Sequence, residues 1–314
     1  ENGNIIYELN NGNGKVKEYN NDKLEFEGEF KNGKRNGKGK EYNLDGNLIF
    51  EGEYKNGNRW NGKGYDGLNN IVYELKNGKG NVKEYDFNGK LGFEGEYLNG
   101  KKNGKGKEYD LFGKLIFEGE YLNGKRNGKG KEYDYNGDLT FEGEFLYNYK
   151  LKGKYYNKKI LEFEGEYINN KKWNGKGFDE NGNIIYELNN GNGKVKEFMF
   201  NGKLEFKGEY NNGKRNSKGK EYNLDGNLIF DGEYLNGNRW NGKGYDGFGN
   251  IVYELKNGKG YVKEYRFNGR LSFEGEYLNG KRNGKGKEYN FGGELMFEGE
   301  YLNGKRNGKG KEYN

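Results

Sequence analysis

One short segment recurs along the whole chain, and this repetition constrains the fold more than any other feature. The segment reads FEGEYLNGKRNGKGKEY at residues 117–133, and its usual step is 24 residues, as between Gly95, Gly119 and Gly143. A fixed period of this length predicts one small structural unit stacked on its neighbours, not a globular domain around a single core. A residue type present in every unit is therefore expected to hold the array together. Versions of the segment begin at Phe26, Phe50, Phe93, Phe117, Phe141, Phe163, Phe206, Phe230, Phe273 and Phe297.

Each unit is predicted to be a β-hairpin. Residues 115–122 alternate between a face of aromatic residues and glycine and a mostly charged face, which is the period of a β-strand. Asn123 and Gly124 then form a turn signal, because both residues tolerate the positive φ of tight hairpin turns. A second short strand follows at 128–133 and ends at another Asn-Gly pair. The expected fold is all-β: an elongated array of stacked antiparallel hairpins in a single extended twisted sheet, without helices.

Two arrangements of side chains are expected within the hairpin. Gly119, Gly128 and Gly130 leave room for aromatic rings to lie against the backbone. The Glu-Gly-Glu triplets and the Gly-Lys-Gly-Lys runs face each other across strands, where each opposite-charge pair contributes about 0.2–1 kcal/mol and helps to set the register. Because a single hairpin is marginal in water, neighbouring units have to cover one another's aromatic faces.

Composition favours a folded chain without a nucleic-acid partner. A mean hydropathy of −1.31 with 33% charged residues is typical of disorder, but 17% aromatic residues at regular spacing can bury substantial surface. The net charge of +6 is spread over the chain with both signs interleaved. Nucleic-acid binding usually requires clustered positive charge, so none is expected. The chain has no cysteine and no histidine, which excludes disulfides and thiolate metal sites.

No catalytic, cofactor or metal site is expected. Ser217, Ser272 and Thr140 are the only serine and threonine residues, and the chain has no histidine to activate them. Paired carboxylates such as Glu118 and Glu120 can hydrolyse glycosides, but such pairs recur in nearly every unit, which favours a structural role. The loops also lack the alternating acidic spacing of a dedicated calcium site. The sequence therefore predicts that the protein is not an enzyme.

Four units are shorter than the others and carry leucine in place of the central glycine. Three of them follow a unit that contains a tryptophan, namely Trp60, Trp173 or Trp240. Because these tryptophans break the pattern, they are candidate partner-binding residues. The alternative is that they fill a packing gap beside the shortened unit, and the sequence leaves both interpretations open. The shortened units lie at 5–18, 71–84, 184–197 and 251–264.

A longer repeat is superimposed on the short one. The segment at 1–18 recurs at 180–197, which indicates a duplication with copies at 1–179 and 180–314, the second incomplete. The predicted organisation is one continuous array over residues 1–314, with about 13–14 units. Both ends fall inside the pattern without a distinct capping repeat. We therefore expect these residues to be part of a longer array, or a subunit whose ends are covered by other subunits.

The segment FEGEYLNGKRNGKGKEYDxxGKL resembles the MORN (membrane occupation and recognition nexus) repeat. That pattern is an aromatic-x-Gly-x-aromatic strand, an Asn-Gly-Lys turn, a Gly-x-Gly strand and a closing glycine, and the ending at 131–137 is similar to a variant common in bacterial proteins. One departure is Asn127, which stands where the family often has histidine. The matching residues are Phe117, Gly119, Tyr121, Asn123, Gly124, Lys125, Gly128, Gly130 and Gly137.

The resemblance implies an extended antiparallel sheet with no chemistry of its own. It also implies scaffolding, tethering or self-assembly, sometimes as dimers, and membrane association in some members. We expect a structural scaffold that binds protein partners or other copies of itself. The first alternative is a subunit of an open fibre or surface filament, formed by head-to-tail joining.

A second alternative is peripheral binding to anionic lipid. Lys125 and Arg126, with equivalents in most turns, form a row of cations that could meet lipid headgroups with up to about 1 kcal/mol per charge. No apolar run is long enough for a transmembrane helix, and the residues after Glu1 do not resemble a signal peptide. Cytoplasmic and cell-surface locations both stay open.

Overall fold

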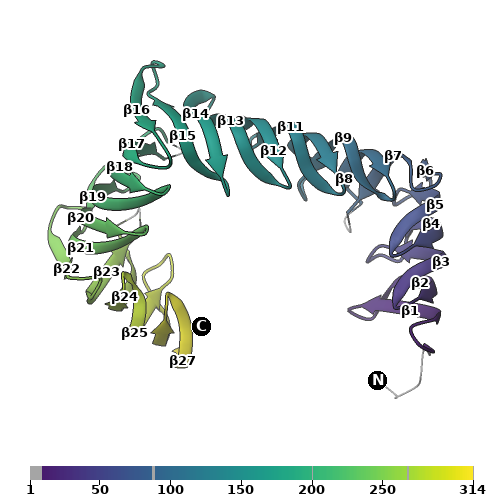
Figure 1. The fold of residues 1–314 in the computed structure, drawn as a ribbon. Coiled ribbons are helices and arrows are strands. Elements are labelled where there is room, and N and C mark those ends of the chain that lie inside the picture. Colours follow the sequence, from purple (N-terminus) through teal and green to yellow (C-terminus); the bar gives the residue numbers. More distant parts are fainter. Residues whose placement is uncertain (1–8, 87–88, 200, 267–268, 314) are drawn as a thin grey trace. The chain divides into compact units, whose positions relative to one another are not determined.

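The described residues fold into strands and tight turns, without helices (Figure 1). They form 27 strands in two compact units, residues 1–153 and 154–314, and the division falls within β13 (Tyr149–Asn157). The predicted all-β array of stacked antiparallel hairpins is confirmed. The computed structural model describes residues 9–86, 89–199, 201–266 and 269–313.

In the first unit, each strand pairs antiparallel with the next one along the chain inside each sheet. The first sheet contains β1 (Gly14–Asn20), β2 (Lys23–Lys31), β3 (Lys34–Tyr42), β4 (Leu48–Lys55), β5 (Asn58–Tyr65) and β6 (Ile71–Leu75). The next sheet begins with β7 (Gly80–Tyr85), β8 (Leu91–Leu98), β9 (Lys101–Tyr109), β10 (Leu115–Leu122), β11 (Lys125–Tyr133) and β12 (Leu139–Leu146).

The second unit repeats this plan. Pairing in chain order joins β14 (Ile160–Ile168), β15 (Lys171–Phe178) and β16 (Ile184–Leu188). A six-stranded sheet contains β17 (Gly193–Phe198), β18 (Leu204–Asn211), β19 (Lys214–Tyr222), β20 (Leu228–Leu235), β21 (Asn238–Tyr245) and β22 (Ile251–Leu255). A five-stranded sheet contains β23 (Gly260–Tyr265), β24 (Leu271–Leu278), β25 (Lys281–Tyr289), β26 (Leu295–Leu302) and β27 (Lys305–Glu312).

The Asn-Gly pairs form the tight turns that the sequence predicts. Asn123 has a φ of 50° and Gly124 a φ of 85°, and both values lie in the left-handed region that a two-residue hairpin turn requires. The turns of successive hairpins are also bonded to one another, since the Gly124 N–H donates to the Lys102 carbonyl at 2.8 Å. This ladder of turns forms one edge of the array, which we call the turn edge.

Asparagine side chains add a second set of bonds along the turn edge. The Asn61 Oδ1 accepts the N–H of Asn77 in the following turn at 2.7 Å, and Asn241 accepts the N–H of Asn257 at 2.6 Å. Asn127 occupies the same place and accepts the Tyr147 N–H at 3.4 Å. The asparagine found where the family often has histidine therefore supports the next turn.

The core is a zigzag of aromatic rings on one face of each sheet. Phe117 is fully buried, and its ring meets Tyr121 edge-on at 5.6 Å between centroids and Phe145 of the next hairpin at 5.2 Å. A Cβ built on Gly119 or Gly130 would stand 2.8 or 2.6 Å from Cζ of Phe117. These two glycines therefore leave room for the ring, as predicted.

Gly128 has a different role from the one predicted. The pairing of β10 with β11 shifts between Gly119 and Tyr121, which makes a β-bulge, and Gly128 there has a φ of 100°. Its nearest neighbour is the Glu120 carboxylate, which accepts the Lys129 N–H at 3.0 Å. Glycine is required here for the left-handed backbone and for the carboxylate, not for an aromatic ring.

The array is divided into several sheets, which corrects the prediction of a single one. Within the described residues, β6 and β7 share a bridge between Lys76 and Lys79 and otherwise pair with different neighbours. Leu75 and Val82 stand opposite glycines and are each 1% exposed, so buried side chains occupy positions that are glycine elsewhere. Elsewhere in the array, glycines pair with one another across neighbouring strands at these positions. Because Leu75 and Val82 carry bulky side chains there, β6 and β7 separate after the turn.

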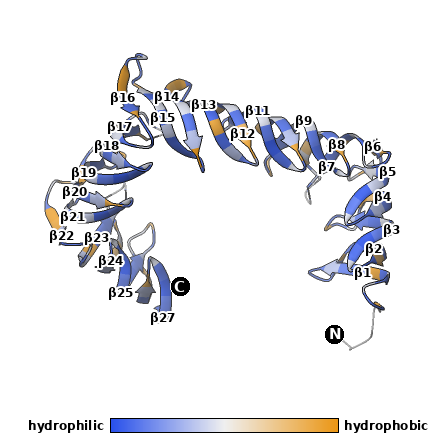
Figure 2. Cartoon of the chain, in the orientation of Figure 1, coloured by the Kyte–Doolittle hydropathy of each residue, from blue (hydrophilic) through white to orange (hydrophobic). Residues whose placement is uncertain are grey.

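The same interruption occurs twice in the second unit, between β16 and β17 and between β22 and β23. β16 and β22 are among the most hydrophobic segments of the chain (Figure 2). The first shortened unit, predicted at 5–18, lies partly outside the described residues.

Candidate interaction surfaces

The three tryptophans lie at the turns of shortened hairpins. The Trp60 carbonyl accepts the Gly78 N–H at 2.6 Å, and a Cβ on Gly78 would meet the Trp60 ring at 2.9 Å. Trp173 and Trp240 make the same contacts with the turn glycines of their own shortened units. All three rings are half-buried. This geometry fits the packing interpretation: each ring supports the short turn that follows it.

Arg126 and Lys125 are adjacent in sequence but lie in different environments. The Arg126 guanidinium is 4.1 Å from the Phe117 ring centroid and bonds to Glu108 at 2.5 Å and Glu132 at 3.0 Å. The two carboxylates therefore neutralise the guanidinium, which stacks on an aromatic ring of the core. The Lys125 side chain is exposed, with its ammonium 5.8 Å from the Tyr147 ring centroid.

The Arg126 contacts belong to a chain of alternating charges, which we call the ion-pair ladder. Burial alone would raise the pKa of Glu108, but hydrogen bonds and charge from Arg126, together with Lys102, hold it below its usual value. Glu132 in turn bonds to Lys150 at 2.9 Å. Equivalent pairs include Arg35 with Glu18 and Glu41, Arg215 with Glu197 and Glu221, and Arg282 with Glu264 and Glu288.

Exposed apolar side chains gather on the loops opposite the turn edge, which we call the loop edge. The loops of Leu68, Phe112, Tyr135 and Phe248 are Asx turns. In one of them the Asp110 Oδ1 accepts the N–H groups of Phe112 and Lys114, both at 2.9 Å. The turn leaves the Phe112 ring 78% exposed, and Phe248 in the second unit is 90% exposed. The strongly exposed set is Leu68, Phe112 and Tyr135 in the first unit, and Phe248 and Phe291 in the second.

Sequence reasoning missed the loop edge. The signal was present, because a bulky apolar residue often follows the Asp or Asn of an Asp-x-x-Gly loop by one or two positions. The alternation that predicts strands does not extend to loop positions, so it does not identify these residues.

The charged face of each sheet carries two rows of side chains beside a row of glycines. Across β1 to β4, Lys17, Glu27, Lys40 and Glu51 stand opposite one another in turn. Lys17 pairs with Glu27 at 3.8 Å, and Lys40 pairs with Glu51 at 3.2 Å. The predicted facing of Glu-Gly-Glu and Gly-Lys-Gly-Lys is confirmed. The shallow groove between the two rows, lined by residues between Lys15 and Glu53, is the first-unit groove.

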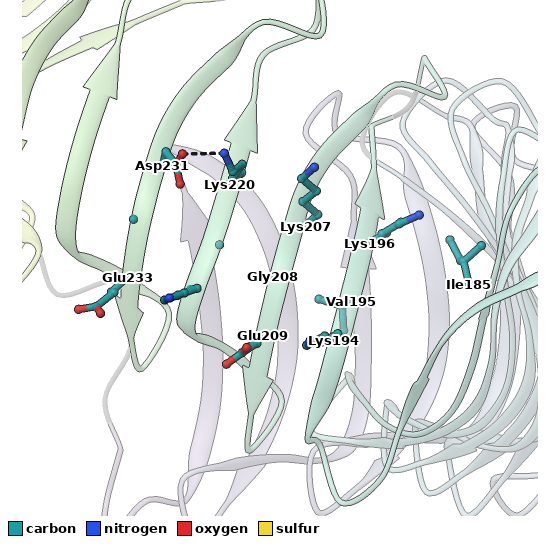
Figure 3. Close-up of a pocket in the computed structure, with 13 residues that line it drawn as sticks. Ile185, Lys194, Val195, Lys196, Lys207, Gly208, Glu209, Lys220, Asp231 and Glu233 are labelled. Carbon is teal, nitrogen blue, oxygen red and sulfur yellow. Dashed lines mark hydrogen bonds and ion pairs between the residues drawn. The ribbon is translucent and has the colours of Figure 1, made fainter.

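The second unit has an equivalent groove with a different charge pattern. Its glycine row is Gly208, Gly219 and Gly232, and Figure 3 shows Lys196, Lys207 and Lys220 along one side, with Asp231 bonded to Lys220. Glu209, Glu233 and Lys194 lie along the other side (Figure 3). We call it the second-unit groove.

Comparison with known proteins agrees with this architecture. The MORN repeat model matches six segments, at residues 26–47, 93–110, 117–139, 206–227, 273–291 and 297–313. These six segments are MORN repeats. No curated protein matches its sequence significantly.

Solved structures that are similar to the MORN-repeat chain include two distant matches. A TcdB2-TccC3 structure without the hypervariable C-terminal region has 12% identity and a TM-score of 0.19, over 90% of this chain and 19% of that one. Alternansucrase in complex with isomaltononaose has 19% identity and a TM-score of 0.18, over 78% of this chain and 16% of that one. The chain thus spans less than a fifth of either protein, and such likeness carries no argument about function.

Two kinds of feature are absent from the described residues. None of their segments forms a helix that is long and apolar enough to span a membrane. They also contain no group of three or more acidic side chains placed to hold a metal ion.

Proposed function

We propose that this MORN-repeat protein is a non-catalytic scaffold that binds protein partners along its loop edge. The observation that carries the proposal is the exposure of Phe112 and Phe248, each held away from its sheet by an Asx turn. Exposed aromatic and aliphatic side chains on several loops of one edge offer repeated anchors for a partner. Other repeated side chains, such as Phe117 and Arg126, are buried or paired within the array and support the fold.

The proposal is tested by placing a photo-crosslinking phenylalanine analogue at position 112 or 248. The matched control places it at position 129, an exposed lysine on the charged face. With protein extract from the source organism, discrete products are expected from positions 112 and 248 and not from 129. Absence of products, or the same products from position 129, would count against the loop edge.

The same variants distinguish partner binding from self-assembly. Crosslinking of the purified chain across a range of concentrations, with electron microscopy and light-scattering mass, shows whether the partner is another copy. Filaments that lengthen with concentration would make the assembly itself the function. Particles of constant mass would direct the search to a different protein.

A further inference from the structure

Lys207 breaks a rule that the other full-length units obey. The residue after the core phenylalanine is acidic in nine of the ten copies, and only the unit that begins at Phe206 has a lysine there. The acidic residues are Glu27, Glu51, Glu94, Glu118, Glu142, Glu164, Asp231, Glu274 and Glu298.

The substitution places like charges opposite one another across three strands. Lys207 pairs in register with Lys196 on β17 and with Lys220 on β19, whereas the first-unit groove alternates lysine and glutamate at these positions. Like charges directly opposite each other destabilise a sheet. Lys220 is held by Asp231 at 2.7 Å. Within the described residues, the Lys196 and Lys207 ammonium groups form no ion pair.

The lysine also removes a bond that other units make. Tyr42, Tyr109 and Tyr133 each donate a hydrogen bond to the glutamate at this position, at 2.6–2.8 Å. Tyr222 has no such acceptor, and the Lys207 ammonium is instead 6.0 Å from its ring centroid. The unit that begins at Phe206 therefore lacks both the alternating ion pairs and the tyrosine–glutamate hydrogen bond of other units.

A second departure lies in the same unit, on the opposite side of the second-unit groove. Ser217 has a φ of 59° where other units have a bulge glycine, such as Gly128. In that unit the Glu120 carboxylate fills the space beside the glycine and accepts the next backbone N–H. The serine side chain takes up this space, and no equivalent bond from Lys218 to Glu209 occurs in the described part of the chain.

We propose that the second-unit groove binds an acidic segment of a protein partner, with Lys196 and Lys207 holding one of its carboxylates. This goes beyond the loop edge, since it concerns another surface and a charged ligand. Between the two sides this face presents only backbone, because a Cβ on Gly208 or Gly219 would point towards the Phe206 ring in the core. The other side of the groove carries Lys194 and Lys218 beside Glu209 and Glu233, so its charges balance, and the excess positive charge lies on the side of Lys196 and Lys207. A segment with an acid on one side and a neutral or basic residue on the other fits both sides.

The test exploits the two grooves of the same chain. The probe is a fluorescein-labelled synthetic peptide of alternating Glu and Gly, and binding is measured by fluorescence anisotropy at low salt. Lys207→Glu restores the rule of the repeat and is expected to weaken binding by about tenfold, with a steep loss of wild-type binding as salt rises. Glu27→Lys creates the lysine cluster in the first-unit groove and is expected to add a second binding site. Equal binding by wild type and Lys207→Glu would overturn the proposal.

Two controls keep the result specific. Because Lys207→Glu gives Tyr222 its acceptor, we expect its melting temperature to rise, so weaker binding cannot come from unfolding. Phe248→Ser on the loop edge should leave peptide binding unchanged, which separates this surface from the one in the proposed function. Vesicles with anionic lipid serve as the competing ligand. If they bind in a Lys207-dependent manner and the peptide does not, the proposal is wrong.

Discussion

At the scale of single residues, one repeated letter has several distinct physical roles. Gly124 provides a left-handed turn, and Gly128 provides a left-handed bulge with room for a carboxylate. Gly119 and Gly130 have no left-handed requirement and instead make space for the Phe117 ring. A substitution should therefore have an effect that depends on which role the glycine serves.

We predict that Gly130→Ala destabilises the first unit by about 1–3 kcal/mol, because the new methyl group would lie 2.6 Å from Cζ of a fully buried ring. Urea unfolding followed by circular dichroism measures the loss. Gly67→Ala is the matched control, since nothing lies within 4 Å of its Cβ and its backbone is not left-handed. Equal effects of the two substitutions would show that the ring can move aside.

At the scale of the hairpin, the ion-pair ladder joins one unit to the next. Arg126 contacts Glu132 on its own strand and Glu108 of the preceding hairpin, and it covers the ring of Phe117. The arginine side chain covers the aromatic face in the way that a second layer of structure covers a sheet in other folds. This role also accounts for an arginine or lysine after most of the turns.

We predict that Arg126→Met costs about 1–3 kcal/mol, because two half-buried carboxylates each lose one of their two cationic partners while the apolar stem is kept. Lys125→Met, next to it and exposed, should change stability by no more than about 0.5 kcal/mol. Chemical denaturation at low and high salt measures both. A similar cost for the two variants would remove the ladder from the account of stability.

The elements that could be predicted are those with a local signal. Strand alternation and Asn-Gly pairs predict the hairpins and turns, and facing Glu and Lys runs predict the register. The bulge at Gly128 escaped prediction, since alternation does not show which residue is left unpaired. The break at Leu75 and Val82 depends on which strand each side chain faces, and the contacts of Arg126 join residues distant in sequence. Of the candidate interaction surfaces, the sequence pattern identified the tryptophans and the cations of the turns, but not the loop edge.

At the scale of the whole molecule, the same bonds recur, so small effects add along the array. Tyr42 and Tyr109 each donate to a glutamate on the neighbouring strand, at 2.8 Å. Partial burial, followed by the bond to that glutamate, raises the pKa of both tyrosines to about 12, from an ordinary value near 10. Tyr133 and Tyr289 have pKa values raised by the same two causes.

These shifts predict a loss of stability in alkaline solution. The folded state holds the phenolic protons more tightly, so it is favoured at pH values below about 10 and loses this advantage as the pH rises towards about 12. Urea unfolding at about pH 8 and about pH 11 should therefore show a marked fall in the free energy of unfolding. Tyr109→Phe removes one of the titrating phenol groups, so its free energy of unfolding should fall less between the two pH values than that of the wild type. If the two proteins lose the same stability, the tyrosine–glutamate bonds do not set the alkaline limit of the fold.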